Sequence, residues 1–131
     1  MKFLRIESSK FTPGIILDPG HNALEFYGFS LPENAIDFYQ PVINWIKELK
    51  GEIEKYPQKA KELNIIFKLV YYNSASFRQL VDIFFIFGEM YKQGIPIQIA
   101  WQYDSEDPQM AEAGKELGDI AHVPVNILAY N

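Results

Sequence analysis

The stretch NIIFKLVYYNSASFRQLVDIFFIFGEM, residues 64–90, determines the fold class of this chain. Its first part, 64–72, is an almost continuous apolar and aromatic run, which predicts a central strand covered on both faces or nearly so. The second part predicts an apolar helix over about 76–93, because Gly94 is a residue type that commonly ends helices. Between them lie Asn73-Ser74-Ala75-Ser76, and the role of these two hydroxyl groups is the main question that the sequence raises.

The rest of the chain alternates strands and helices around this unit. Residues 14–18 and 24–27 flank a Pro-Gly turn and predict an N-terminal β-hairpin. Downstream, the pattern predicts a strand over 95–101, a short polar helix over 107–118 and a last strand over 123–128. Helices placed between strands indicate parallel pairings, so we expect an α/β fold with a mixed sheet, helices packed on it and the antiparallel hairpin at its front.

A helix is also expected between the hairpin and the central strand. Ser30 and Glu33 fit a capping box, in which an N-cap serine and a glutamate three residues later bond to backbone amides. Pro41 lacks a backbone donor and clashes with the preceding helical turn. We therefore expect a short turn that ends near Tyr39, followed by a main helix that opens at Pro41 and stops near Tyr56.

Length and composition favour a single globular domain spanning residues 1–131. The 131 residues are 48% hydrophobic and 22% charged, which is a folded balance. The formal charge of -5 gives no electrostatic footprint for nucleic acid or for an anionic membrane. There is no cysteine, and no run approaches the roughly 20 apolar residues of a membrane helix. We expect a soluble cytoplasmic protein.

Motifs of nucleotide-binding and hydrolytic enzymes are absent from the sequence. No GxGxxG, GxxxxGK[ST] or HExxH pattern occurs. The segment Gly28-Phe29-Ser30-Leu31-Pro32 resembles a nucleophile elbow, but proline replaces its last glycine. Only His21 and His122 are available as a general base, and both are expected at the surface or at a strand edge. We therefore do not expect an enzyme with catalytic residues or a cofactor.

One acidic cluster supports an alternative. Asp104, Glu106 and Asp107 follow a predicted strand, and their carboxylates could hold a divalent cation in a small-molecule-binding or enzymatic domain. Acidic residues at this position also cap a following helix and complement its dipole. Because the spacing is not that of a calcium-binding loop, capping is the favoured interpretation and no metal site is expected.

The helix predicted over 76–93 carries too many apolar residues for one buried stripe. Arg78 and Asp82 mark its polar side, and at 100° per residue Phe85 or Ile86 must fall on or beside that side. The helix is either sandwiched deeply in the core or displays an apolar patch that binds a partner. The periodicity alone does not decide between these two interpretations.

The hydroxyls of Ser74 and Ser76 also have two interpretations. A serine at a helix N-terminus usually caps it by accepting a bond from a free amide, which is worth about 1 kcal/mol. The same position suits a phosphate, which adds roughly -1.5 to -2 charges at neutral pH beside the positive end of the helix dipole. From the residues alone, capping is the more common role.

Several stretches taken together resemble the SiaC family of bacterial regulatory phosphoproteins, which is similar to the STAS-type anti-sigma-factor antagonists. The ordered set spans nearly the whole chain and is more specific than any of its pieces. It consists of Thr12-Pro13 with Ile15, Gly28-Phe29-Ser30-Leu31-Pro32-Glu33-Asn34, Phe38-Tyr39, Pro41, Trp45, Tyr72-Asn73-Ser74-Ala75-Ser76 and Trp101-Gln102-Tyr103-Asp104.

This resemblance implies a STAS-like sheet backed by helices and a hydroxyl that is phosphorylated by a GHKL-type protein kinase and dephosphorylated by a PP2C-type phosphatase. The unphosphorylated form is expected to bind and activate a diguanylate cyclase. The family pattern is similar to Asn-Thr-Ser-Ser, so the phosphoacceptor falls on Ser74, with Ser76 as the second choice. Asn73 is expected to shape the turn and to bind the partner, together with Arg78, Phe85 and Ile86 on the following helix.

Overall fold

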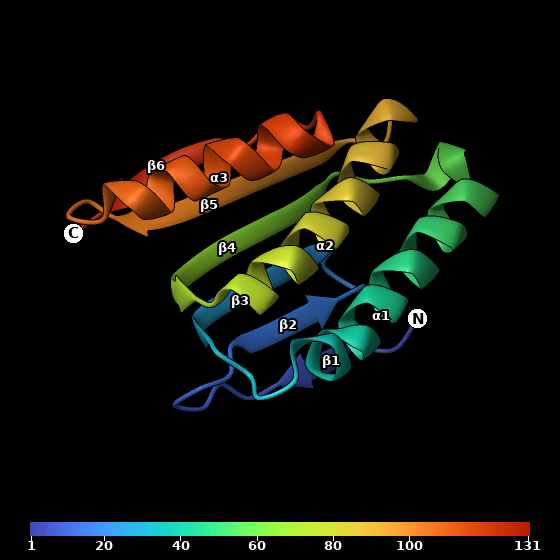
Figure 1. The fold of residues 1–131 in the computed structure, drawn as a ribbon. Helices are drawn as coiled ribbons and strands as arrows, with labels where there is room; N and C mark the ends of the chain where they lie inside the picture. The colour runs from blue at the N-terminus through green and yellow to red at the C-terminus, as the bar shows by residue number, and fades with distance from the viewer.

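The computed structural model describes all residues, 1–131, as a six-stranded sheet with three helices (Figure 1). The strands follow the order of the sequence across the sheet. The first three pair antiparallel, and each later strand is parallel to the one before it. The elements are β1 (Leu4–Ile6), β2 (Gly14–Asp18), β3 (Ala23–Ser30), α1 (Ala35–Lys55), a 3-10 turn (Pro57–Lys59), β4 (Leu63–Tyr72), α2 (Ser74–Lys92), β5 (Ile97–Asp104), α3 (Pro108–Ala121) and β6 (Asn126–Tyr130).

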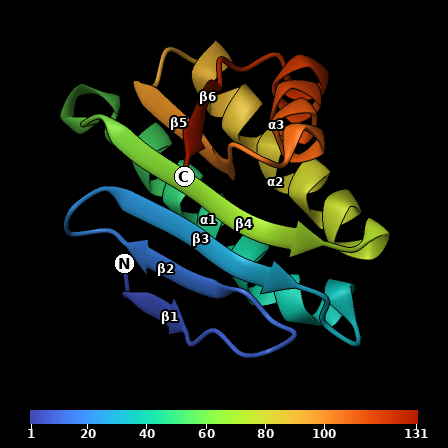
Figure 2. The same ribbon diagram turned by 90° about the vertical axis from the view of Figure 1, so that its left-hand side faces the viewer.

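The predicted α/β class, the mixed sheet and the N-terminal hairpin are confirmed. Helices α1, α2 and α3 each connect one parallel strand to the next in the same direction across the sheet. Because such crossovers are almost always right-handed, successive connections of this kind lie on the same face. Figure 2 shows all three helices behind the sheet and the opposite face uncovered. The more specific likeness to STAS domains stays a prediction.

The expectation that the central strand is covered on both faces is wrong. In β4, burial alternates along the strand: Phe67 and Leu69 are buried, whereas Lys68 and Val70 are exposed. Alternate side chains of a strand point to opposite faces of the sheet, and only one face of this sheet carries helices. On the uncovered face, the Lys68 ammonium group lies 4.7 Å from the centre of the Tyr130 ring, which shields part of that face without a second helical layer.

The core lies between the sheet and the helices. It contains 29 buried residues, and its centre is Phe67 of β4. The Phe67 ring is 4.5 Å from the Phe26 ring, 5.0 Å from Phe84 and 5.4 Å from Trp101, measured between ring centroids. Aromatic pairs at these distances contribute stability beyond the area that they bury. They join β3, β4, β5 and α2 into one packed unit, which fixes the position of the α2 N-terminus.

Helix α1 begins later than expected. Ser30 is not an N-cap: it is the last residue of β3 and is fully buried. The cap is Asn34, whose side-chain oxygen accepts a bond from the Asp37 amide at 3.1 Å. The predicted Ser30 cap is wrong because β3 extends through Ser30, beyond the predicted 24–27, which leaves the cap to Asn34.

Pro41 lies inside a continuous α1, which corrects the predicted division of this segment into two parts. Its side chain is exposed, while Tyr39, Val42 and Ile46 on the opposite side of the helix are fully buried. Burial of such side chains contributes about 1.5–3 kcal/mol each, so several of them outweigh the roughly 3 kcal/mol cost of an internal proline. The end of the helix at Lys55, just before Pro57, is as predicted.

The pairing of β3 with β4 contains a bulge beside the start of α2. Gly28 is opposite Leu69, but the next residue, Phe29, is opposite Tyr71, so Val70 is the extra residue of β4. Gly28 has a φ of 91°, a backbone conformation that favours glycine. The bulge exchanges the two faces of β4 beyond Val70, so that Tyr71 is exposed and Tyr72 packs against the core, whereas β3 keeps its alternation up to the buried Ser30.

Candidate functional site

Asn73 connects β4 to α2 and caps the helix. Its side-chain oxygen accepts a bond from the Ser76 amide at 2.8 Å, and its own amide donates to the Ser30 carbonyl at 3.0 Å. The backbone of Asn73 is extended, with φ of -92° and ψ of 172°, so the turn does not use a left-handed conformation. Neither serine is therefore the N-cap of α2, and the capping interpretation of the two hydroxyls is wrong.

Ser76 is fully buried and belongs to a hydroxyl cluster with Ser30 and Tyr39. The Ser76 hydroxyl donates to the Ser30 carbonyl at 3.0 Å and accepts from the Ser30 hydroxyl at 2.8 Å. The Ser30 hydroxyl is in turn 2.7 Å from the Tyr39 hydroxyl. Burial raises the pKa of Tyr39 to about 12, although its hydrogen bond with Ser30 opposes part of this effect. The cluster joins α2 to the end of β3 and to α1.

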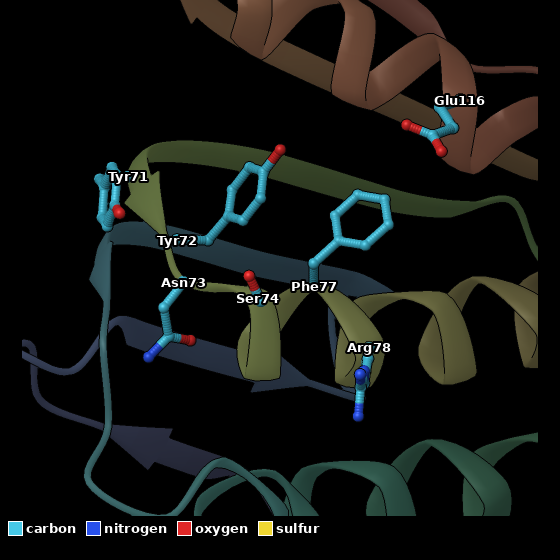
Figure 3. Close-up of a pocket in the computed structure, with 7 residues that line it drawn as sticks. All are labelled: Tyr71, Tyr72, Asn73, Ser74, Phe77, Arg78 and Glu116. Carbon is cyan, nitrogen blue, oxygen red and sulfur yellow. The ribbon is translucent and has the colours of Figure 1, made fainter.

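Ser74 is the first residue of α2 and is exposed. Its hydroxyl makes no hydrogen bond within the protein, in contrast to both of its polar neighbours. Figure 3 shows this hydroxyl on the same side as the Tyr72 ring, in a pocket of about 500 Å³. The pocket lies between the end of β4, the first turns of α2 and the facing side of α3; it is lined by Tyr71, Tyr72, Asn73, Ser74, Phe77, Arg78 and Glu116.

The charged groups of this pocket come from two helices. Arg78 lies one turn after Ser74 on α2, is exposed and forms no ion pair. Glu116 of α3 lines the opposite side of the pocket. The pKa of Tyr72 is raised, first by partial burial and then by the negative charges of Glu116 and Asp107. A new negative charge on this pocket would therefore meet one free cation on α2 and repulsion from α3.

Phe85 and Ile86 differ sharply in exposure. The Phe85 side chain is 46% exposed, whereas that of Ile86 is 7% exposed and belongs to the core. Adjacent residues are 100° apart around a helix, and Ile86 falls on the side that packs toward the sheet and α1. Ile86 is therefore buried at the base of the groove that Phe85 also lines, and its place on the partner surface stays a prediction. Ile36 of α1, which the sequence reasoning missed, is 63% exposed and lines the same groove between α1 and α2 as Phe85.

The acidic cluster of the alternative hypothesis does not form a shared site. Asp104 accepts a bond from the Glu106 amide at 2.9 Å, and Asp107 caps α3 by accepting from the Met110 amide at 3.2 Å. No group of three or more histidine or carboxylate side chains in the chain lies close enough to hold a metal ion. The Asp104 side chain stabilises the turn and that of Asp107 caps the helix, as the capping interpretation predicts, whereas the Glu106 side chain forms no hydrogen bond.

None of the three helices is both long and apolar enough to cross a membrane. Even α2, the most apolar of them, carries Arg78, Asp82, Glu89 and Lys92 along its length.

Comparison with known proteins places this arrangement in a family. The sequence model of the SiaC family regulatory phosphoproteins matches residues 6–130. A relative in Pseudomonas aeruginosa strain UCBPP-PA14, described as an uncharacterised protein, is 28% identical over 131 residues, which cover all of this chain and 99% of the relative.

Solved structures are similar over the whole fold. The crystal structure of apo-SiaC from Pseudomonas aeruginosa has a TM-score of 0.86 and 27% identity, covering 98% of this chain and all of that one. A structure of the diguanylate cyclase SiaD in complex with its activator SiaC, from the same organism, matches at a TM-score of 0.85 and 27% identity over 97% of this chain and 99% of that chain. The chain belongs to the SiaC family of regulatory phosphoproteins.

Proposed function

We propose that this protein is a non-enzymatic regulator whose binding to a diguanylate cyclase is switched by phosphorylation of Ser74. The observation that carries this proposal is the division of roles among the polar residues at the start of α2. Asn73 caps the helix and Ser76 holds it to the core, so Ser74 has an exposed hydroxyl with no structural role. A kinase can reach this oxygen without unfolding the site.

The proposed partner follows from the family and from one relative. SiaC of Pseudomonas aeruginosa is the activator of the diguanylate cyclase SiaD and forms a complex with it. We infer a cyclase of the same kind as the partner of this chain. A GHKL-type kinase would phosphorylate Ser74 and a PP2C-type phosphatase would remove the phosphate. Because ATP and GTP are cytoplasmic substrates, we place the system in the cytoplasm.

The proposed cyclase surface is the exposed side of α2, with Phe85 as its apolar anchor. Phe85 separates two grooves, one facing α1 and one facing α3. Arg78 and Ile36 extend this surface toward the α2 N-terminus and toward α1. Aromatic and arginine side chains carry much of the binding energy at protein interfaces. This surface contains both, and neither residue is engaged within the protein.

Helix geometry explains how Ser74 would control this surface. Ser74 and Phe85 are about three turns apart, which places them within about 20° of the same line and about 16 Å apart along the axis. A phosphate at that distance is beyond the Debye length of about 8 Å, so it would not act on Phe85 directly. A standard interface of about 800 Å² per partner covers both positions, however. Phosphorylation would then place a charge inside the interface and weaken binding.

The test is phosphorylation by the cognate GHKL-type kinase with Mg-ATP, mapped by tandem mass spectrometry. We expect one phosphate on Ser74 in the wild-type protein and none in Ser74→Ala. Ser74→Thr is the matched control, since it keeps a hydroxyl at the same exposed position and is expected to be modified.

The second part of the test is capture of the cyclase. We expect the unphosphorylated protein and Ser74→Ala to bind it and the phosphorylated protein to lose it. Modification of another residue, or equal binding by the two forms, would overturn the proposal.

A further inference from the structure

A second surface lies beside Ser74, on the side away from α3. We call it the aromatic groove: it has a volume of about 750 Å³ and lies between the loop after β1 and the ends of β3 and β4. Three large aromatic side chains line it, namely Phe11, Phe29 and Tyr71, and they are 57%, 43% and 51% exposed. A cluster of exposed aromatic residues of this kind marks an interaction site more often than it marks ordinary surface.

The groove is built by fixed backbone features. The bulge at Val70 turns Tyr71 to the uncovered side of the sheet, directly opposite Phe29. The other wall is a short loop in which the Thr12 amide donates to the Ser9 hydroxyl at 3.1 Å. The carbonyl of Phe11 accepts from the Leu31 amide at 2.7 Å, which ties the loop to the end of β3. The aromatic side chains are therefore presented by a preformed frame, and a partner need not order it.

The groove is continuous with the Ser74 pocket, because Tyr71 lines both. The two sides of Ser74 differ in charge, however. None of the eight residues that line the aromatic groove is acidic, and Lys10 stands over the Phe11 ring with 5.5 Å between its nitrogen and the ring centre. The other side of Ser74 carries both Glu116 and Arg78, whose formal charges cancel, whereas the groove carries Lys10 with no acidic residue. In a chain of net charge -5, the groove is therefore the more positive of the two sides and the one that favours an anionic partner surface.

We propose that the aromatic groove is the docking surface of the ATP-bearing kinase that phosphorylates Ser74, with anchors other than those of the α2 surface proposed for the cyclase. This inference rests on the proposed function. A kinase delivers a phosphoryl group from a nucleotide that carries several negative charges, and it must bring these charges to the Ser74 hydroxyl. Approach over Lys10 and the aromatic side chains avoids Glu116, whereas approach over α3 does not.

The two proposed surfaces meet at Ser74 but have their anchors on different sides of it. The Ser74 pocket alone is too small for a specific complex, which needs about 800 Å² on each partner. The kinase must contact Ser74 itself and can extend over Phe11 and Phe29, on one side of that residue. Phe85 lies about 16 Å away from Ser74 in the direction of the α2 C-terminus. Loss of an anchor on one surface is then expected to leave binding at the other intact.

The experiment compares Phe11→Ser with Phe85→Ser, each tested with both partners. Both residues are exposed, and the two variants lose the same kind of side chain. For Phe11→Ser we expect the kcat/KM of Ser74 phosphorylation to fall about tenfold or more, as the loss of one interface anchor does, while capture of the cyclase is unchanged. For Phe85→Ser we expect the reverse. Circular dichroism and thermal melting establish that both variants are folded.

Lys10→Glu is a second variant, and it tests the charge of the groove. We expect it to be phosphorylated more slowly than the wild-type protein, with the largest difference in rate at low ionic strength, where charge repulsion is screened least. Unchanged phosphorylation of Phe11→Ser and Lys10→Glu would overturn the inference while leaving the switch at Ser74 in place. Loss of cyclase capture by Phe11→Ser would overturn it as well. Absence of phosphate on the wild-type protein would instead overturn the proposed function and this inference together.

Discussion

Ser74 and Ser76 are two positions apart on α2, yet they occupy opposite environments. Ser76 points into the core, where its hydroxyl bonds to both the carbonyl and the hydroxyl of Ser30. Ser74 points to solvent and bonds to nothing in the protein. Two positions correspond to about 200° around a helix, so the second residue is carried to the far side. The Ser76 hydroxyl therefore stabilises the fold, whereas the Ser74 hydroxyl is exposed to solvent without a partner.

The largest test of this difference is the same substitution at both positions. Ser76→Asp would bury a carboxylate among neutral hydroxyls, so we expect it to lower the free energy of unfolding by about 3–5 kcal/mol. Ser74→Asp places the charge in water at the N-terminus of α2, where the dipole favours it by about 0.3–1 kcal/mol. Urea titration of the two variants measures this difference. Equal losses would mean that the two serines are not on opposite sides of the helix surface.

The hydroxyl cluster also predicts a loss of stability in alkali. The pKa of Tyr39 is about 12 in the folded protein and 10.0 without the fold, so the folded state holds its proton more tightly. The contribution of Tyr39 to the free energy of unfolding is fully present below pH 10. It falls by about 3 kcal/mol in all as the pH rises from about 10 to about 12. The measurement is the unfolding free energy of wild type minus that of Tyr39→Phe across this range. A difference that stays constant with pH would contradict the burial of a neutral Tyr39.

A milder change removes only the hydrogen bonds of one serine. Ser76→Ala leaves the buried hydroxyl of Ser30 without its acceptor, and we expect a loss of about 1–3 kcal/mol. Ser74→Ala removes no contact, so its effect is expected to stay within about 0.5 kcal/mol. Thermal melts of the two alanine variants in one buffer provide the comparison. A larger loss for Ser74→Ala would show that its hydroxyl has a structural partner.

The smallest expected effect concerns the cap between the strand and the serines. Asn73→Ala removes the acceptor for the Ser76 amide and is expected to cost about 1 kcal/mol. Asn73→Asp keeps an acceptor at this position and serves as the control, with little loss expected. The measurement is urea denaturation of both variants. If Asn73 served only to recognise a partner, both variants would unfold at the same urea concentration as the wild-type protein.

Much of the fold follows from local patterns that the sequence displays. The ends of α1 and α2 were predictable because Pro57 and Gly94 have a direct effect on the backbone: one cannot continue a helix, and the other adopts a φ of 86° just after it. The order of strands and helices was also predictable, because the spacing of apolar residues along the chain differs between strands and helices. The start of α1 was not, because it depends on how far β3 pairs with β4, and this pairing makes Ser30 a strand residue.

The sequence pointed to Ser74, which stays a prediction, but it did not show the division of roles among the polar residues around it. The resemblance to the SiaC family pointed to Ser74, whereas residue chemistry alone favoured a capping serine. The sequence could not reveal that Asn73 takes the cap, because serine and asparagine are equally good caps. Burial of Ile86 and exposure of Ile36 were also hidden, since each depends on how closely α1 packs against α2. The bulge at Val70 likewise arises from pairing between strands that are distant in sequence.

Helix α2 is held at two points along its length, and this has a mechanical consequence. Ser76 bonds its first turn to β3, and at Gly88 the helix approaches α3 so closely that an added Cβ atom would lie 2.2 Å from the Ala121 carbonyl oxygen. These two contacts oppose rotation or sliding of α2. If Ser74 is phosphorylated as proposed, we expect both forms to share one backbone, so that the phosphate would act through surface charge without a change of shape.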